Sequence, residues 1–332
     1  MKTIFEVLKA VSEKLSAVQI ENPRLDAEIL LAHVLNCRRL TLYVDSDKIL
    51  PLESILKLNE LVNRRLEDAG IDSPRLDAEI LLAHVLKWRR LNLYIDAKKN
   101  LPLESILRFN DLINLRLKKI PVAYLTGAKE FMGLAFAVNE KVLIPRPETE
   151  ILTEFVGEFL RSRGGGNFLD LGAGSGAIFI SILKFVKNSR AIAVDISKDA
   201  LQVAKFNAEK FHVEDRAEFF CGNLFEPLEG KIFDAIVSNP PYIPTRELET
   251  LQEEVRREPR LALDGGADGL NFYRRIISDA PKFLVDGGLL AVEVGLNQAA
   301  AVKNLFEREN FSDAEIFKDL AGIERVVAAR KF

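Results

Sequence analysis

The run Ser238-Asn239-Pro240-Pro241-Tyr242 has the clearest capacity for chemistry, and it follows an apolar segment typical of a buried strand. The two prolines stiffen the backbone and leave no amide donor beside the Pro240 carbonyl, so this oxygen can accept a hydrogen bond from a ligand. The Asn239 side-chain oxygen offers a second acceptor. Together they can hold both hydrogens of a planar NH2 group, on which Tyr242 can stack. The alternative is a rigid loop that merely ends a strand.

A second candidate site is the glycine-rich run LDLGAGSGA, which ends one predicted strand and precedes a helix. Gly172, Gly174 and Gly176 permit a tight turn and let a ligand approach the backbone closely. Gly172, Gly174 and Ala177 also satisfy the dinucleotide fingerprint G-x-G-x-x-A, so the glycines alone do not identify the ligand.

Asp195 ends the next predicted strand, 19 residues beyond Gly176. A carboxylate there can accept hydrogen bonds from both hydroxyls of a ribose, which fits the adenosine of NAD or of S-adenosylmethionine. The alternative is a cap for the helix that starts after Ser197. An amide nitrogen is a weak nucleophile, so the Asn239 site would act by aligning it with a sulfonium methyl. No strong base is needed, because the nitrogen can lose its proton after it gains the methyl.

Alternating strands and helices from residue 166 onward predict an α/β fold in which helices cover both faces of a mostly parallel sheet. The predicted strands are NFLDL, RAIAVD, AEFFC, IFDAIVSN and LLAVEVG, and helices begin at Ala177 and Lys198. The final segment predicts two more strands, paired as a hairpin at one edge. Both candidate sites follow strands of this sheet.

An internal repeat occupies the N-terminal third: PRLDAEILLAHVL at residues 23–35 recurs unchanged at 74–86, an offset of 51 residues. Its apolar spacing indicates helices, so we expect an all-helical N-terminal domain with one ordinary copy and one extra copy. We divide the chain into residues 1–120 with repeats at about 23–68 and 74–119, a linker with a β-hairpin at 121–143, and an α/β domain at 144–332.

The bulk composition is that of a soluble globular protein, with 48% hydrophobic and 29% charged residues. No apolar stretch is long enough to cross a membrane or to act as a signal peptide, so we expect a cytoplasmic protein. Two cysteines and three histidines have no metal-ligand spacing, so no metal is expected. A net charge of −3 argues against a broad surface for duplex nucleic acid.

Taken together, LDLGAGSGA, Asp195 and NPPY resemble the class I methyltransferases that act on amide or exocyclic nitrogens. LIPRPETE at residues 143–150, PVAYLTGAKEF and EPRLALDGGADGL narrow the resemblance to the bacterial release factor glutamine methyltransferases. It covers the chain apart from one repeat copy. It implies a Rossmann-like, seven-stranded sheet whose last strand is antiparallel. It also implies methyl transfer from S-adenosylmethionine, leaving S-adenosylhomocysteine, to the glutamine of the GGQ motif in class I peptide chain release factors.

The resemblance also implies which residues form the site. The implied cofactor-binding residues are Asp170, Gly172, Ala173, Gly174, Ser175, Gly176, Asp195, Asn223, Leu224 and Asn239. Those implied to bind the substrate glutamine are Asn239, Pro240, Pro241 and Tyr242, of which Asn239, Pro240 and Tyr242 are implied to be catalytic. Asn223 stands where an aspartate is expected, although its oxygen can still accept a hydrogen bond from an adenine amino group. Arg146 and Glu148 would either order the entrance or form an ion-paired connector.

Several alternatives remain open from the sequence. A ribosomal protein glutamine, or an adenine or cytosine amino group in nucleic acid, would suit the same Asn-Pro-Pro-Tyr site. An inactive scaffold or a helical interaction module would explain the duplication but not the preserved site residues. We expect residues 74–117 to occupy the ordinary position of the N-terminal domain, because they adjoin the linker.

Overall fold

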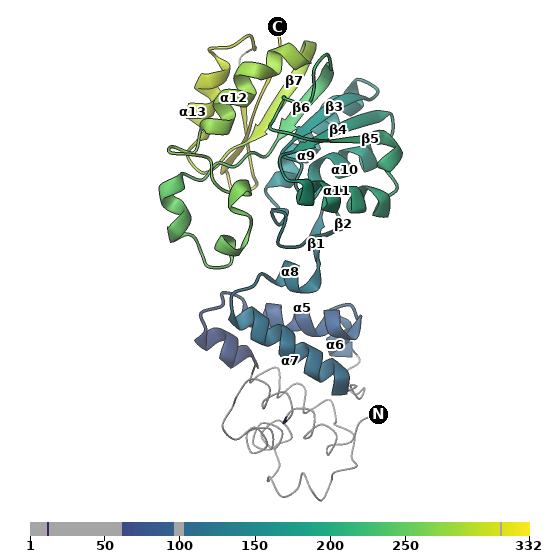
Figure 1. Ribbon diagram of the computed structural model, residues 1–332, viewed down its shortest axis with the longest axis vertical. Coiled ribbons are helices and arrows are strands. Elements are labelled where there is room, and N and C mark those ends of the chain that lie inside the picture. Colours follow the sequence, from purple (N-terminus) through teal and green to yellow (C-terminus); the bar gives the residue numbers. More distant parts are fainter. Residues whose placement is uncertain (1–11, 13–61, 96–102, 313) are drawn as a thin grey trace, which may run out of the picture. The chain divides into compact units, whose positions relative to one another are not determined.

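The computed structural model describes residues 12, 62–95, 103–312 and 314–332. Contacts divide the chain into two compact units, Met1–Thr126 and Gly127–Phe332 (Figure 1). The first repeat copy, predicted at about residues 23–68, lies outside the described residues apart from its last turns. The second copy is described in large part.

The described part of the first unit is helical, as predicted. After a helical segment at residues 62–68, its helices are α5 (Pro74–Leu86), α6 (Asn92–Ile95), α7 (Leu103–Leu117) and α8 (Val122–Thr126). Pro74 occupies the first turn of α5, where its missing N–H costs no hydrogen bond. Phe109 and Ile113 of α7 pack into a buried cluster with Leu81 of α5. Asp77 and Arg116 form a buried ion pair at 2.7 Å that links the same two helices.

An antiparallel hairpin begins the second unit, inside the segment 121–143 where a hairpin was expected. Its strands are β1 (Ala128–Phe131) and β2 (Leu134–Ala137). Met132 and Gly133 form the turn with positive φ angles of 51° and 69°. Helix α8, which falls in the same predicted linker, belongs to the first unit.

A seven-stranded sheet forms the centre of the second unit, which confirms the predicted α/β fold. Its order is β5-β4-β3-β6-β7-β9-β8. The strands are β3 (Gly166–Leu171), β4 (Ser189–Asp195), β5 (Ala217–Cys221), β6 (Phe233–Ser238), β7 (Leu284–Glu293), β8 (Glu315–Lys318) and β9 (Glu324–Arg330). Strands β3 to β7 pair in parallel, while β9 is antiparallel to both β7 and β8.

Helices cover both faces of this sheet (Figure 1). One face carries α9 (Thr149–Ser162), α10 (Ala177–Phe185) and α11 (Lys198–Lys210); the other carries α12 (Asn271–Asp279) and α13 (Ala299–Phe306). Side chains of β3 alternate between the faces, with Phe168 on the first and Leu169 and Leu171 on the second. Short 3₁₀ helices are η1 (Glu214–Arg216), η2 (Thr245–Thr250), η3 (Val255–Arg257), η4 (Arg260–Ala262) and η5 (Ala280–Phe283).

The strand register brings both candidate sites to one edge. Leu171 at the end of β3 pairs with Val194 of β4 on one side and with Ser238 of β6 on the other. The glycine turn after β3 therefore lies between Asp195 and Asn239, at the carboxyl edge where ligands bind in such sheets. Among the described helices, none has the length and apolar character needed to span a membrane.

Candidate active site

A cavity of about 400 Å³ opens at this edge of the sheet. Its walls come from the glycine turn, the ends of β4, β5 and β6, the segment before α9, and the loop and helix that follow β6. The lining residues are Lys141, Val142, Leu143, Leu171, Gly172, Gly174, Val194, Asp195, Ile196, Ser197, Ala200, Gly222, Asn223, Leu224, Ser238, Asn239, Pro240, Pro241, Pro259, Leu261, Ala262, Phe272 and Arg275. Residues from both halves of the predicted site thus share one cavity.

The glycine turn folds back on β4. The backbone N–H groups of Gly172 and Ala173 both donate to the Val194 carbonyl, at 2.8 and 3.1 Å. Gly172 and Gly174 have positive φ angles of 76° and 54°, which explains the need for glycine. A Cβ added at Gly172 would meet no atom within 4 Å, so the turn leaves open space where it borders the cavity.

Asp195 ties the end of β4 to the glycine turn. Its carboxylate accepts hydrogen bonds from the Gly174 N–H at 2.9 Å and from the Ser197 N–H at 2.8 Å. Burial raises the pKa of Asp195 above its ordinary value, and the hydrogen bonds from Ser197 and Gly174 oppose that effect. Ser197, rather than Asp195, caps helix α11 by accepting from the Ala200 N–H at 3.1 Å. The predicted helix-capping alternative therefore belongs to a neighbouring residue.

Four residues predicted in the glycine run do not line the cavity: Asp170, Ala173, Ser175 and Gly176. Asp170 is fully buried, and its Oδ2 accepts from the Phe179 N–H at 3.3 Å. Burial raises the pKa of Asp170 to about 7. Gly176 precedes helix α10 with a φ of 84°. These residues shape the turn from behind the cavity.

Asn223 and Leu224 line the cavity beyond β5, as the resemblance implied for an adenine pocket. The Asn223 Nδ2 donates to Glu226 Oε1 at 2.8 Å. This bond engages the amide nitrogen and leaves the Asn223 side-chain oxygen able to accept a hydrogen bond. The departure from aspartate therefore preserves an acceptor at this position.

In the Asn-Pro-Pro-Tyr run, Asn239, Pro240 and Pro241 line the cavity. Asn239 Nδ2 donates to the Thr149 hydroxyl at 3.1 Å, which fixes the side chain against the first turn of α9. Ser238 Oγ donates to the Leu171 carbonyl at 2.7 Å and joins the ends of β6 and β3. The run is thus anchored to the strand that carries the glycine turn.

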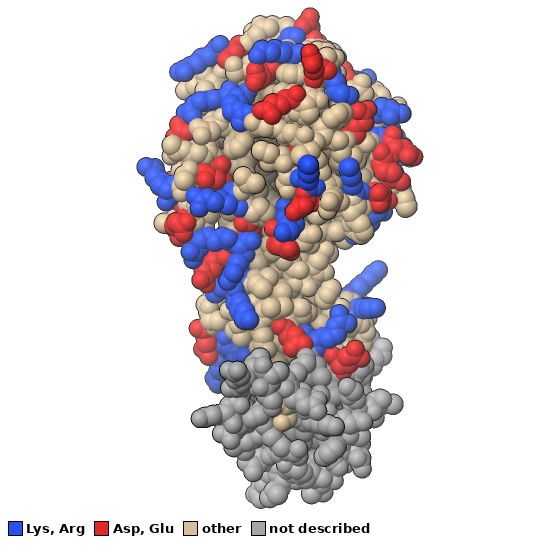
Figure 2. Space-filling model, in the orientation of Figure 1, with Lys and Arg blue, Asp and Glu red and all other residues tan. Residues whose placement is uncertain are grey.

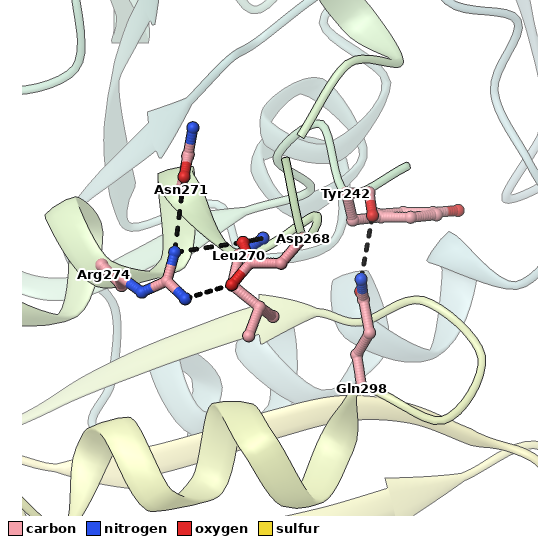
Figure 3. Close-up of polar contacts among 6 residues, drawn as sticks. All are labelled: Tyr242, Asp268, Leu270, Asn271, Arg274 and Gln298. Atoms are coloured by element: carbon pink, nitrogen blue, oxygen red, sulfur yellow. Dashed lines mark hydrogen bonds and ion pairs between the residues drawn. The ribbon is translucent and has the colours of Figure 1, made fainter. Parts of the chain in front are cut away.

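Tyr242 does not line the cavity, although stacking there was expected. Its ring packs against the buried side chains on the face of the sheet that carries α12 and α13, and burial raises the pKa of its hydroxyl to about 12. Three glycines leave room for Tyr242. A Cβ added at Gly265 would lie 2.7 Å from the Tyr242 Cα, and one added at Gly295 would lie 2.9 Å from its ring. A Cβ added at Gly269 would clash with the Tyr242 carbonyl oxygen. That carbonyl accepts from Gln298 Nε2 at 2.9 Å (Figure 3).

The loop behind Tyr242 is braced by its own polar contacts. Arg274 of α12 pairs with Asp268 and also donates to Asn271 Oδ1 at 3.3 Å (Figure 3). The sequence EPRLALDGGADGL therefore has two parts with different tasks. Pro259, Leu261 and Ala262 line the cavity, whereas Gly265 and Gly269 leave room beside Tyr242.

Arg146 and Glu148 are both ion-paired. Arg146 pairs with the buried carboxylate of Glu258, which also accepts from the Ile144 N–H at 2.9 Å. Glu148 lies 3.8 Å from Arg325 of β9. The Arg146–Glu258 pair joins the cavity wall at residues 141–143 to the wall at 259–262. Arg146 therefore fits the predicted alternative of an ion-paired connector.

Sequence reasoning missed three polar residues that support the site. Asn207 of α11 bonds to both backbone groups of Ala137 and donates to the Ser175 carbonyl at 2.9 Å, joining the hairpin to the glycine turn. Thr149 lies in LIPRPETE but received no separate role. Glu293 ends β7 and is 3% exposed; burial raises its pKa to about 7, against hydrogen bonding from Thr149 and Asn239. An acid that ends an apolar strand was the available signal for Glu293.

Comparison with known proteins identifies the family. The family model described as the PrmC N-terminal domain matches twice, at residues 6–68 and 63–127, and the methyltransferase small domain matches residues 147–267. The release factor glutamine methyltransferase of Geobacter sulfurreducens is 42% identical over 278 residues, which is 83% of this chain and 96% of that protein. This chain belongs to the release factor glutamine methyltransferase family. The resemblance stated from the sequence motifs is confirmed.

Other members of the release factor glutamine methyltransferase family are similarly related. The protein of Clostridium acetobutylicum is 45% identical over 256 residues, covering 76% of this chain and 90% of its own. Among solved structures, the catalytic domain of hMettl16, crystallised with the MAT2A 3′UTR hairpin 6, matches with a TM-score of 0.51 and 17% identity. That match covers 67% of this chain and 82% of the hMettl16 chain and supports the methyltransferase fold alone.

No group of three or more His, Cys, Asp and Glu side chains is arranged to bind a metal ion within the described ranges. The chemistry available at the cavity is instead that of amide, carbonyl and carboxylate groups. Asn239 and Pro240 offer acceptors on one side, and the glycine turn with Asp195 forms the other.

Proposed function

We propose that this chain transfers a methyl group from S-adenosylmethionine to the side-chain amide nitrogen of the glutamine in the GGQ motif of class I peptide chain release factors. The single observation that carries the proposal is that Asn239 and Pro240 share one cavity with Gly172, Gly174 and Asp195. Membership of the release factor glutamine methyltransferase family supports this choice of substrate over other amide or amine groups.

The cavity fits an adenosyl cofactor. Open space over Gly172 admits a ligand close to the backbone, and Asp195 is a carboxylate acceptor suited to ribose hydroxyls. Ile196 and Leu224 supply apolar wall, while the Asn223 oxygen can accept from an amino group. When bound there, S-adenosylmethionine would supply a methyl group on a positively charged sulfur.

The chain's own residues would then position the glutamine. Asn239 Oδ1 and the Pro240 carbonyl would accept the two N–H hydrogens of the substrate amide, which is planar and neutral. Holding both hydrogens aims the out-of-plane lobe of the nitrogen toward the methyl and limits the motion of the amide. Such alignment is the main source of rate acceleration for a weak nucleophile. The nitrogen gains the methyl, then gives a proton to solvent, so no side chain must act as a strong base.

Mass spectrometry of intact and digested substrates tests the proposal. The purified full chain would be incubated with S-adenosylmethionine and, in separate reactions, a class I release factor, the same factor with its GGQ glutamine changed to glutamate, ribosomal proteins, DNA and RNA. We expect one methyl group on the GGQ glutamine and none on the glutamate variant. Methylation confined to ribosomal protein or nucleic acid, or cofactor binding without any product, would overturn the proposal.

We further propose that the protein acts in the cytoplasm and does not bind duplex nucleic acid directly. On the face of the second unit seen in Figure 2, Lys and Arg side chains are interspersed with Asp and Glu rather than gathered into one broad patch. Binding of a duplex by a surface of mixed sign would lack the counterion release that dominates such affinity.

A further inference from the structure

Asn239 and Glu293 end neighbouring strands of the sheet. Ser238 of β6 pairs with Val292 of β7 in parallel register, so the residues that follow, Asn239 and Glu293, come side by side at the carboxyl edge. Asn239 borders the cavity, whereas Glu293 lies behind it and is 3% exposed. A carboxyl group in such a place is costly to bury, which calls for a reason for its presence.

Thr149 lies between the two side chains. It is the first residue of α9, is 4% exposed, and accepts a hydrogen bond from Asn239 Nδ2 at 3.1 Å. Burial raises the pKa of the Glu293 carboxyl, and hydrogen bonding from Thr149 and Asn239 opposes that effect, so both side chains face this carboxyl. Glu293 Oε2 has no hydrogen-bond partner among the described residues.

Because a hydroxyl has a single hydrogen, these contacts determine which group donates and which group accepts. A Thr side chain has one donor hydrogen, and an ionised carboxylate can only accept. If Thr149 donates to Glu293, its hydroxyl can only accept from Asn239. The Asn239 amide must then turn its NH2 toward Thr149 and its oxygen toward the cavity. Without the carboxyl, Thr149 could donate to Asn239 and present the wrong end of the amide.

We propose that Glu293, together with Thr149, is a positioning residue that fixes which end of the Asn239 amide faces the substrate. The inference rests on the proposed glutamine methylation, since only an NH2-bearing substrate requires an acceptor at this point. A reversed Asn239 would place its own NH2 against the substrate NH2, and two donors repel rather than bind.

The test compares variants at Thr149 and Glu293 in the full chain. Thr149→Val keeps the shape but removes the hydroxyl, while Thr149→Ser keeps the hydroxyl. Thr153→Val is the matched control: Thr153 is one turn further along α9 and 1% exposed, and its hydroxyl donates to the Thr149 carbonyl at 3.0 Å. Glu293→Leu removes the acceptor, and Glu293→Gln retains a carbonyl acceptor of similar shape.

We expect Thr149→Val and Glu293→Leu to lower kcat about 100-fold, the scale of a small misplacement at a reacting centre. Calorimetric affinity for S-adenosylmethionine should stay unchanged, and affinity for a GGQ peptide in the presence of S-adenosylhomocysteine should fall. Thr149→Ser, Glu293→Gln and Thr153→Val should retain most of the activity. Thermal unfolding of each variant would establish that it is folded.

Two outcomes would overturn the inference while leaving the proposed function intact. One is wild-type kcat and peptide affinity in Thr149→Val, and the other is equal loss in Thr149→Ser and Thr149→Val, which would indicate packing rather than hydrogen bonding. If Glu293→Leu fails to fold, the Thr149 pair still decides. Failure of the proposed function itself is a different result, because the unmodified chain would then leave the GGQ glutamine without a methyl group.

Discussion

The Asp195 carboxylate accepts a hydrogen bond from the Gly174 amide at 2.9 Å, so the acid that ends β4 and the glycine turn that follows β3 form one unit. A second bond, from the Ser197 amide at 2.8 Å, fixes the other carboxylate oxygen. The same side chain that can bind a ribose therefore also holds the turn that borders it, and the two roles can be measured separately.

Changing Asp195 should weaken cofactor binding and destabilise the turn. Asp195→Ala leaves two N–H groups without their acceptor, and we expect the free energy of unfolding to fall by about 1–3 kcal/mol. The dissociation constant for S-adenosylmethionine should rise about 10- to 100-fold, because hydrogen bonds to a charged group are lost. Calorimetry and urea unfolding measure the two effects. Asp199→Asn, an exposed acid in the next helix, should change neither.

Alanine substitutions at two glycines of the same run should have different effects, one on cofactor affinity and the other on stability. Gly172→Ala strains a left-handed residue by about 1–2 kcal/mol and places a methyl group at the cavity wall, so cofactor affinity should fall. At Gly176 a Cβ would lie 2.7 Å from Ile180 and 2.8 Å from Phe179, so Gly176→Ala should lose more stability.

Gly164→Ala is the control for backbone strain. Its φ is 81°, its added Cβ would meet no atom within 4 Å, and it does not line the cavity. It should match Gly172→Ala in stability while binding S-adenosylmethionine normally. Equal affinity in Gly172→Ala and Gly164→Ala would contradict the cofactor site proposed at the turn.

Asp170 should make the protein less stable as the pH rises. Burial raises its pKa from 3.8 to about 7, so between these values the folded state retains a proton that the unfolded state releases. The stability that protonated Asp170 contributes is therefore fully present below about pH 4 and is lost as the pH rises through about 7. Relative to wild type, Asp170→Asn should gain about 2–4 kcal/mol between pH 5 and pH 8. Urea unfolding at both pH values checks this, and parallel profiles would argue against it.

Breaking the Arg146–Glu258 pair should loosen two cavity walls. Glu258→Ala leaves Arg146 and the buried Ile144 N–H without their acceptor, and we expect a loss of about 3 kcal/mol in the free energy of unfolding. The exposed pair of Arg260 and Glu249, at 3.7 Å, offers a comparison. Glu249→Gln should cost less than about 0.5 kcal/mol. Similar losses from both substitutions would show that burial of the first pair is unimportant.

Deleting one repeat copy tests the duplication. Removing residues 23–73 joins residue 22 to 74 and leaves a single uninterrupted copy, because the offset is 51 residues. If the copy beside the linker occupies the ordinary position, kcat and KM for a release factor should be retained. The double match of the PrmC N-terminal domain supports the expectation that each copy is one such domain. A crystal structure with the first copy against the β1–β2 hairpin would refute the expectation that residues 74–117 occupy the ordinary position.

The sequence predicted the architecture well because strands, glycine turns and the proline pair leave local signals. Gly172, Asp195 and Asn239 each follow a strand, and parallel order alone brings such residues to one edge. The sequence did not predict how Tyr242 is held in place, since the glycines that leave room for it follow at a distance along the chain. Thr149 and Asn239 are 90 residues apart, so no local pattern could predict their bond.

The glycines around Tyr242 have a consequence for judging relatives. None of Gly265, Gly269 and Gly295 borders the cavity, yet each leaves room that a methyl group would take from the tyrosine. A related chain could keep the Asn-Pro-Pro-Tyr sequence and still have this segment displaced if any of these three positions gained a side chain. Small residues at all three are therefore a better criterion than the tetrapeptide alone for separating working enzymes from inactive descendants.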